Sequence, residues 1–537
     1  MTFGTLWPFG DTKVKYEEAT QKFGDPTWRQ QIKLSWEYPK VGYVIDHLTP
    51  KNYLPYFNRL LKAFPRPKSK LDRSFFIDSW EVETEKLWCD NFDKDFVKKY
   101  GYDITKFMDS IYRPAYKMQL FDYMSLVSEK VVRFYKDFDS ALNSAGVLSR
   151  GQVSGAPCDL ISGYSILDIP EGESMLFEPE FCAIPSSAAA LSGKSIVSSE
   201  TFTCIYGWPR DYLREEQAAD LKLVADALFA NGINHIIWHG KPHNKANSDS
   251  TNFYATTHIG TNSLLNKEIK QFNFYLEKVQ TNMRLGNPYF NIAVYLPTED
   301  AWIKGVMPKE LQFKWAWGYY EMRYVYFPDE LKGFNNCWVN NDFLTKSKVI
   351  NGKIHIGSNI FEAVYINSDY VSNSTIKELL RIANEGGSII LKKIPSHPGY
   401  VSAKEYKEIL EKLLDNSNVH RQVPIFVKPF IVSENKLKFY TRKDKDTYYI
   451  FFANPLSNSI KFPMEYGQSF NNSTYSFYVG VNIEGRLTEL SLRFKPYQSL
   501  LYKIKDGVAE QINIEFIPST PTVKKRPSSY LAPWLVK

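Results

Sequence analysis

Cysteine is scarce in this sequence, and its few positions follow no pattern. The 537 residues include five cysteines, an odd number, and no two of them stand at CxxC spacing. Structural zinc sites and disulfide frameworks both depend on cysteines paired at short and regular spacings. The sequence therefore argues against either kind of cross-link.

Long apolar runs, basic clusters and glycine-rich phosphate loops are missing as well. No run is apolar enough to span a membrane, and the amino terminus shows neither the basic region nor the apolar region of a signal peptide. The formal charge of +7 comes from dispersed lysines, with one dense basic run at residues 524–527, so no nucleic-acid partner is expected. Because no GxGxxG motif occurs, we expect no nucleotide cofactor.

Aromatic residues, by contrast, are abundant. They make up 15% of the chain, within an otherwise ordinary globular composition of 44% hydrophobic and 23% charged residues. Sugar-binding clefts use such rings because the apolar face of a pyranose stacks on them, although aromatic-rich cores explain the same composition. The length of the chain predicts two to four domains.

The first half of the chain has the pattern of a parallel α/β domain, since short apolar runs alternate with amphipathic stretches over residues 1–288. Seven strands are expected, at about residues 2–7, 41–47, 74–83, 146–155, 173–177, 195–202 and 234–240. Seven strand–helix units predict a (β/α)₈ barrel of the TIM type whose first βα unit is missing. Such barrels carry catalytic residues at the carboxyl ends of their strands.

Two further domains are expected after the barrel. Residues 289–425 read as strand, helix, Gly-Gly stop and strand, which predicts a doubly wound α/β domain. Residues 426–537 contain short alternating strands separated by turn residues. That pattern predicts a C-terminal antiparallel β-sandwich.

Carboxylates occur at two predicted strand ends where barrel glycosidases often hold theirs. If residues 234–240 form strand eight, then Glu81 or Glu83 ends strand four and Glu200 ends strand seven. Glycoside hydrolysis needs such a pair, one group as acid and the other as base or nucleophile. A single glutamate at a strand end is more often a cap or an ion-pairing group. Two of them, each amid Trp, Ser or Thr, favour a glycosidase.

The two glutamates at the first of these strand ends are expected to repel each other. Side chains alternate along residues 74–83, so Glu81 and Glu83 share one face. Adjacent carboxylates repel each other unless one binds a cation or stays protonated. A calcium ion held partly by Glu81 would resolve the conflict, and a raised pKa would make Glu83 an acid.

Other residues near predicted strand ends are candidates for a sugar pocket. These substrate-binding candidates are Trp7, Asp46, His47, Trp80, Arg150, Gln152 and His239. For His239 a structural role explains its position equally well. A zinc pair formed by His239 and His243 is not expected, because Gly240 and Pro242 disfavour the helix that their spacing would need.

Six segments also resemble, in order, the large α-L-rhamnosidase-type glycoside hydrolases of family 106. The segments lie within residues 1–302 and are TFGTLWPFG (2–10), residues 75–108, 151–173, 185–203 and 220–240, and VYLPTEDAW (294–302). The resemblance implies an exo-acting, inverting hydrolysis of terminal L-rhamnose from polysaccharides, with Glu83 as general acid, Glu200 as general base and a bound calcium ion. It also implies a periplasmic or secreted location. An inverting pair of carboxyl groups should stand roughly 6.5–9.5 Å apart.

Two departures from the family pattern keep other functions open. Ser154 stands in GQVSG where a substrate-contacting histidine is expected, and the first barrel strand is missing. One alternative is a catalytically inactive, carbohydrate-binding remnant of such an enzyme. The other is a non-hydrolytic barrel enzyme, a lyase or an isomerase, that acts on sugars.

Overall fold

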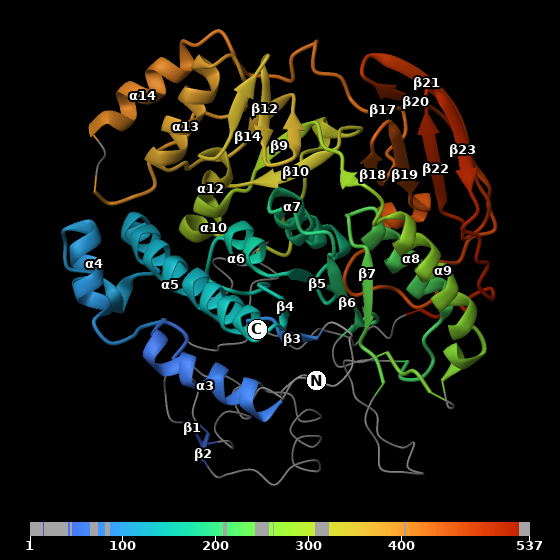
Figure 1. Ribbon diagram of the computed structural model, residues 1–537, viewed down its shortest axis with the longest axis horizontal. Coiled ribbons are helices and arrows are strands. Elements are labelled where there is room, and N and C mark those ends of the chain that lie inside the picture. Colours follow the sequence, from blue (N-terminus) through green and yellow to red (C-terminus); the bar gives the residue numbers. More distant parts are fainter. Residues whose placement is uncertain are drawn as a thin grey trace.

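The chain folds into three units that pack against one another (Figure 1). The structure is a computed structural model that describes residues 14–15, 41–42, 46–64, 73–80, 86–207, 212–241, 257–260, 263–306, 322–401 and 404–525. We call the units the barrel unit (residues 46–282), the α/β unit (residues 292–420) and the β unit (residues 287–288 and 431–512). Within the described ranges, no helix combines the length and the apolar character that a membrane span requires.

The barrel unit is built on five parallel strands that follow one another in chain order across the sheet. The strands are β3 (Ser74–Ile77), β4 (Leu148–Gly151), β5 (Ile169–Met175), β6 (Ser198–Thr203) and β7 (His235–Trp238). The helices that connect and follow them are α5 (Lys117–Ser144), α6 (Leu160–Ile166), α7 (Ala183–Leu191), α8 (Ala218–Phe229) and α9 (Ile269–Asn282). A parallel sheet with a helix in every crossover is half of a (β/α)₈ barrel, so the predicted fold class is confirmed.

The segment near residue 41 differs from its prediction as a parallel barrel strand. Val41–Gly42 (β2) pairs antiparallel with Val14–Lys15 (β1), and the turn that follows leads into helix α3 (Pro50–Ala63). The prediction of a parallel strand over residues 41–47 is therefore wrong. An apolar run indicates extended chain but does not determine which segment it pairs with. The strand predicted at residues 2–7 lies outside the described residues.

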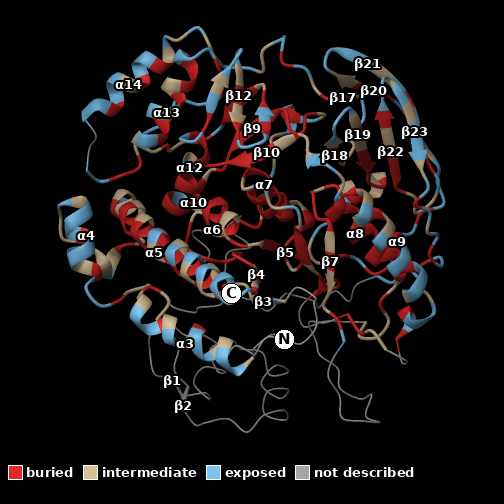
Figure 2. Ribbon diagram, in the orientation of Figure 1, coloured by how far each residue is buried: buried red, intermediate tan, exposed pale blue. Residues whose placement is uncertain are grey.

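The centre of the molecule is formed by elements that are buried on every side. All residues of β5, α7 and α8 are buried, and Figure 2 shows the buried class concentrated along β5 and α7. Helix α8 contains the charged residues Lys222 and Asp226, which form an ion pair one turn apart at 2.6 Å. Tyr275 from α9 and Ser499 from the β unit both donate hydrogen bonds to Asp226. These partners compensate the burial of two charges.

The α/β unit has a five-stranded parallel sheet in the order β10-β9-β14-β15-β16. Its strands are β9 (Ile292–Tyr295), β10 (Asn336–Val339), β14 (Ala363–Ile366), β15 (Ser388–Leu391) and β16 (Val419–His420). Strands β10 and β14 flank β9 on opposite sides, so the chain reverses direction there and the sheet is doubly wound, as predicted. Its helices are α10 (Thr298–Lys304), α12 (Asn341–Leu344), α13 (Asn373–Asn384) and α14 (Lys404–Leu414), and a small antiparallel sheet comprises β11 (Lys348–Ile350), β12 (Lys353–Ile356) and β13 (Asn359–Phe361).

The β unit consists of two antiparallel sheets that enclose an apolar core, the predicted sandwich. The first sheet contains β8 (Asn287–Pro288), β18 (Phe439–Asp444), β19 (Thr447–Phe452), β22 (Leu500–Lys505) and β23 (Val508–Ile512). The second contains β17 (Ile431–Val432), β20 (Tyr475–Ile483) and β21 (Arg486–Phe494). Strand β8 precedes the α/β unit in the chain and pairs with β18. The domain boundaries at residues 288 and 425 stay predictions.

One buried carboxylate joins the barrel unit to the β unit. Asp220, in the first turn of α8, is fully buried and accepts a hydrogen bond from the Tyr206 hydroxyl at 2.8 Å. From the β unit it accepts bonds from the Gly467 amide at 2.8 Å and from the Ser469 amide and hydroxyl at 3.0 and 2.6 Å. A fifth donor, Gln217 Nε2 of the barrel unit, lies 3.4 Å from the same carboxylate. The three donors from the β unit fix how the two units dock.

Candidate active site

Polar side chains from neighbouring strands meet inside the barrel unit. Residues two positions apart on a strand share a face, so Glu171 and Glu173 on β5 point the same way. Arg150 lies on β4, and Gln152 directly follows this strand. The parallel register places Glu173 opposite Glu200 of β6. The contacts described below show that Arg150, Gln152, Glu171 and Glu200 face one another inside the half-barrel.

Glu200 lies at the centre of this group and is held by three partners. The Thr203 hydroxyl donates to Glu200 Oε1 at 2.6 Å, and Gln152 Nε2 donates to Oε2 at 3.1 Å. Nδ1 of His239, which directly follows β7, lies 3.1 Å from Oε1. Burial opposes the charge, but the charge and hydrogen bond of His239, together with the two donors, lower the pKa of the Glu200 carboxyl below its usual value. Glu200 is therefore ionised at neutral pH, as a general base must be.

The partners of Glu200 are themselves held in place. The Gln152 amide nitrogen of the backbone donates to Ile77 O at 3.0 Å, and the buried Ser154 hydroxyl donates to Gln152 Oε1 at 3.4 Å. This contact turns Nε2 of Gln152 toward Glu200. Ser154, which replaces the expected histidine, is fully buried and acts on the site through Gln152. Thr203 reaches Glu200 because the strand departs from regular geometry at Phe202, whose φ is 76°.

Two further carboxyl groups near Glu200 have pKa values above the usual range. Asp78 directly follows β3 and is partly exposed, and burial together with the charge of Glu200 raises the pKa of its carboxyl. Glu171 on β5 is fully buried, and burial raises the pKa of its carboxyl to about 7 even though Arg150 and Ser198 favour the charged form. One ionised carboxylate beside two that keep a proton near neutrality is the electrostatic division that acid–base catalysis requires.

The sequence-based site omitted both Asp78 and Glu171. The predicted strand began at residue 173, whereas β5 begins at Ile169, so Glu171 was not assigned to a strand. The available signal was the segment PEGE, which places Glu171 and Glu173 two residues apart in a buried strand. Asp78 was visible only as the first acidic residue after the apolar run of β3.

Arg150, Trp80 and His47 contact other side chains of the barrel unit. Arg150 Nε lies 3.0 Å from Glu171 Oε2, and its guanidinium stacks 4.5 Å above the ring of Phe76. The Trp80 side chain is buried and its ring lies 4.9 Å from that of His47.

The backbone around Trp80 is fixed by the GQVSG segment. The Trp80 amide donates to Ser154 O at 2.9 Å. Gly155, with a φ of 74°, passes so close that a Cβ there would lie 2.9 Å from Trp80 O, which explains the glycine. Asp46 caps the turn before α3 by accepting from the Leu48 amide and the Asn52 side chain at 2.8 and 3.0 Å. The sugar-binding roles of these residues stay predictions.

Three of the predicted site residues, Trp7, Glu81 and Glu83, lie outside the described residues. The distance between Glu83 and Glu200 and the role of Glu83 as acid therefore stay predictions. Over the parts of the chain that the structure describes, no three His, Cys, Asp or Glu side chains converge in a way that could hold a metal ion. The predicted calcium ion rests on Glu81 alone, and no step below depends on it.

Comparison with known proteins identifies chains of similar sequence and similar fold. A scan against models of protein families finds no match for this chain. In sequence, the chain is similar to a curated protein of Formosa agariphila named "Putative beta-glucuronidase", with 23% identity over 372 residues. The match covers 65% of this chain and 29% of that protein, so the chain spans less than a third of the length of this relative.

In structure, the chain is similar to a rhamnosidase from Novosphingobium sp. PP1Y, with a TM-score of 0.66 at 13% identity over 92% of this chain and 50% of the rhamnosidase. A β-galactosidase from Bacillus circulans sp. alkalophilus matches with a TM-score of 0.52 at 12% identity, over 87% of this chain and 84% of that enzyme. At these identities the likeness shows the fold alone. The chain has the fold of barrel glycosidases, and its membership of family 106 stays a prediction.

Proposed function

We propose that the protein is an exo-acting glycoside hydrolase that removes a terminal α-L-rhamnose from a polysaccharide with inversion at the anomeric carbon. The observation that carries the proposal is Glu200, an ionised carboxylate held by Gln152, Thr203 and His239 inside the half-barrel. A carboxylate fixed in this way is suited to take a proton from water. The fold shared with a rhamnosidase and a β-galactosidase supports the class of reaction.

In the proposed reaction, Glu200 accepts a proton from a water molecule as the water attacks the anomeric carbon. A second carboxyl group donates a proton to the leaving oxygen. Glu83 is the predicted acid. Asp78 is a second candidate, because burial and the neighbouring Glu200 charge favour its protonated form. Glu171 stays bound to Arg150 and Ser198 and helps to orient the wall of the pocket.

The charges around Glu200 favour a neutral sugar over a uronic acid. The raised pKa of Asp78 and of Glu171 leaves Glu200 as the ionised carboxylate of this group. Among the described residues nearby, Arg150 is engaged with Glu171 and His239 with Glu200. The charge of Glu200 would repel the carboxylate of a glucuronide. This argument supports a rhamnoside rather than a glucuronide, the substrate that the name of the Formosa relative suggests.

A panel of aryl glycosides tests the proposal. We expect turnover of an aryl α-L-rhamnoside, at least about 100-fold faster than of the corresponding β-D-glucuronide, and release of β-L-rhamnose as the first product by NMR. Sugar binding without turnover would indicate the inactive remnant instead. A product with new ultraviolet absorbance would indicate a lyase. Release of the α anomer would overturn inversion and make Glu200 a nucleophile.

The pH dependence of the reaction should report the contact between His239 and Glu200. His239 lowers the pKa of the Glu200 carboxyl, and a base acts only above its pKa. Replacing His239 by alanine should therefore raise that pKa and move the acidic limb of kcat/KM to higher pH by about one unit or more. A His397→Ala variant, altered in the α/β unit, should keep the wild-type profile. An unchanged acidic limb in His239→Ala would contradict the assigned coupling.

The remaining implications of the resemblance, a bound calcium ion and a periplasmic or secreted location, stay predictions. The carbohydrate partner is part of the proposal. The panel of aryl glycosides described above tests this partner as well.

A further inference from the structure

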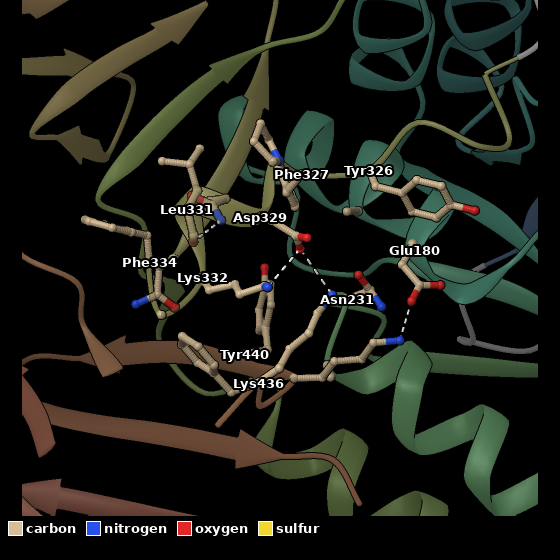
Figure 3. A pocket seen from close by; sticks show the side chains of 18 of the residues that line it. Glu180, Asn231, Tyr326, Phe327, Asp329, Leu331, Lys332, Phe334, Lys436 and Tyr440 are labelled. Carbon is tan, nitrogen blue, oxygen red and sulfur yellow. Dashed lines mark hydrogen bonds and ion pairs between the residues drawn. The ribbon is translucent and has the colours of Figure 1, made fainter. Parts of the chain in front are cut away.

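A second cavity lies where the three units meet, separate from the Glu200 site. Its volume is about 450 Å³, which is within the range of small-molecule sites, roughly 300–1,000 Å³. The lining comes from the helical region 180–187 and residues 230–231 of the barrel unit, residues 325–338 of the α/β unit, and residues 436–461 of the β unit. Figure 3 shows these side chains converging from different elements. None of the carboxylates around Glu200 belongs to the lining.

The rim of this cavity carries an excess of positive charge. Its charged lining residues are Lys332, Lys436, Lys438, Lys461, Glu180 and Asp329. Asp329 serves two lysines, since its Oδ1 lies 3.2 Å from Lys332 Nζ and 3.4 Å from Lys436 Nζ. Lys438 pairs with Glu180, and Lys461 pairs with Glu178 just outside the lining. One ammonium charge is left over, on lysines whose side chains are 48% and 55% exposed.

The walls offer unused hydrogen-bonding groups of both kinds. Two lining donors, Trp338 Nε1 and Asn335 Nδ2, are buried and have no hydrogen-bond partner within the described structure. The same holds for three lining acceptors, Asn336 Oδ1, Asn458 Oδ1 and the second carboxylate oxygen of Glu180. Buried polar groups are nearly always paired, so orphaned groups around a cavity indicate a missing partner. A ligand with hydroxyl groups satisfies both kinds, because a hydroxyl donates and accepts.

Aromatic side chains also line the cavity. Phe327 is partly exposed and stacks on Trp338 with ring centroids 4.3 Å apart and planes inclined by 15°. Phe439 of β18 is another partly exposed ring in the lining. Aromatic rings offer apolar faces to sugar rings, while the lysines offer positive charge. The combination excludes a purely apolar ligand.

We propose that this cavity is a second carbohydrate site, which binds a saccharide unit bearing a carboxylate or a sulfate group. We assign it a binding role, because its two lining carboxylates, Glu180 and Asp329, are engaged with lysines. It goes beyond the proposed hydrolysis and does not depend on it. An acidic unit bound here would hold a polysaccharide on the protein, whereas the carboxylate-rich Glu200 site takes a neutral sugar.

Calorimetric titration of the full chain with small sugars tests the assignment. The probes are glucuronate, galactose 6-sulfate, glucose and acetate. We expect at least one of the two acidic sugars to bind at least about 10-fold more tightly than both glucose and acetate. The acidic sugar that binds distinguishes a carboxylate site from a sulfate site.

Matched lysine variants locate the binding. The exposed pair Lys332→Gln with Lys436→Gln should weaken the acidic sugar about 10-fold or more, whereas Lys445→Gln, in an exposed turn of the β unit, should leave it unchanged. All variants should keep the wild-type melting temperature. No saturable binding of either acidic sugar, equal binding of acetate or glucose, or an unchanged affinity in the double variant would overturn the proposal.

Discussion

Replacing Glu200 by glutamine should lower kcat on an aryl α-L-rhamnoside by about 10²–10⁴-fold, with a much smaller change in KM. Glutamine has the shape of glutamate but cannot accept the proton of the attacking water. Gln152 Nε2 and the Thr203 hydroxyl donate to the two different carboxylate oxygens at 3.1 and 2.6 Å. In the variant, the single amide oxygen can accept from Gln152 Nε2, and the amide nitrogen can donate to the Thr203 hydroxyl oxygen. The site should therefore keep its geometry and lose its base. Initial rates over a range of substrate concentrations measure both constants.

The same assay on other variants separates the roles of the carboxyl groups. Glu405→Gln, on the exposed side of α14, is the matched control and should retain full activity. Glu83→Gln and Asp78→Asn identify the acid, since loss of an acid slows substrates with poor leaving groups more than activated aryl glycosides. Wild-type kcat in Glu200→Gln, with an unchanged melting temperature, would remove Glu200 from the mechanism.

Asp220→Ala should lower the free energy of unfolding by about 3–5 kcal/mol and loosen the β unit from the barrel unit. The substitution leaves four donors from Tyr206, Gly467 and Ser469 without their shared acceptor in a buried position. Asp220→Asn keeps one acceptor oxygen and should cost less. Thermal unfolding measures the loss of stability. Hydrogen exchange of residues 459–475 measures the loss of docking.

An exposed aspartate of the β unit provides the control for this stability effect. Asp446→Ala, in the turn between β18 and β19, should change the free energy of unfolding by no more than about 0.5 kcal/mol. If Asp220→Ala lowered stability but left exchange around Gly467 and Ser469 unchanged, the carboxylate would stabilise α8 alone. Equal effects of the Asp220 and Asp446 variants would contradict a docking role altogether.

The sequence by itself determined the classes of the three units and the strand that carries Glu200. Glu200 is the third residue of β6 (Ser198–Thr203), however, and not its end as predicted. Strands and helices are recognised by apolar residues that recur every two and every 3.6 residues, and this recurrence is a local property of the chain. The apolar run before Asp78 and the run that contains Glu200 were therefore readable. The same local pattern led to an error at residues 41–47, because the partner of a strand is not encoded by its own alternation.

Only the tertiary structure decided which groups act on Glu200. Gln152, Thr203 and His239 approach it from the segment after β4, from the end of β6 and from the segment after β7. The positive φ of Phe202 turns Thr203 toward it. Burial and through-space charge set the pKa values of Glu171 and Glu200 in opposite directions, although both are glutamates on adjacent strands. Electrostatic energy depends on distance and solvent exposure, and neither quantity can be read from positions along a chain.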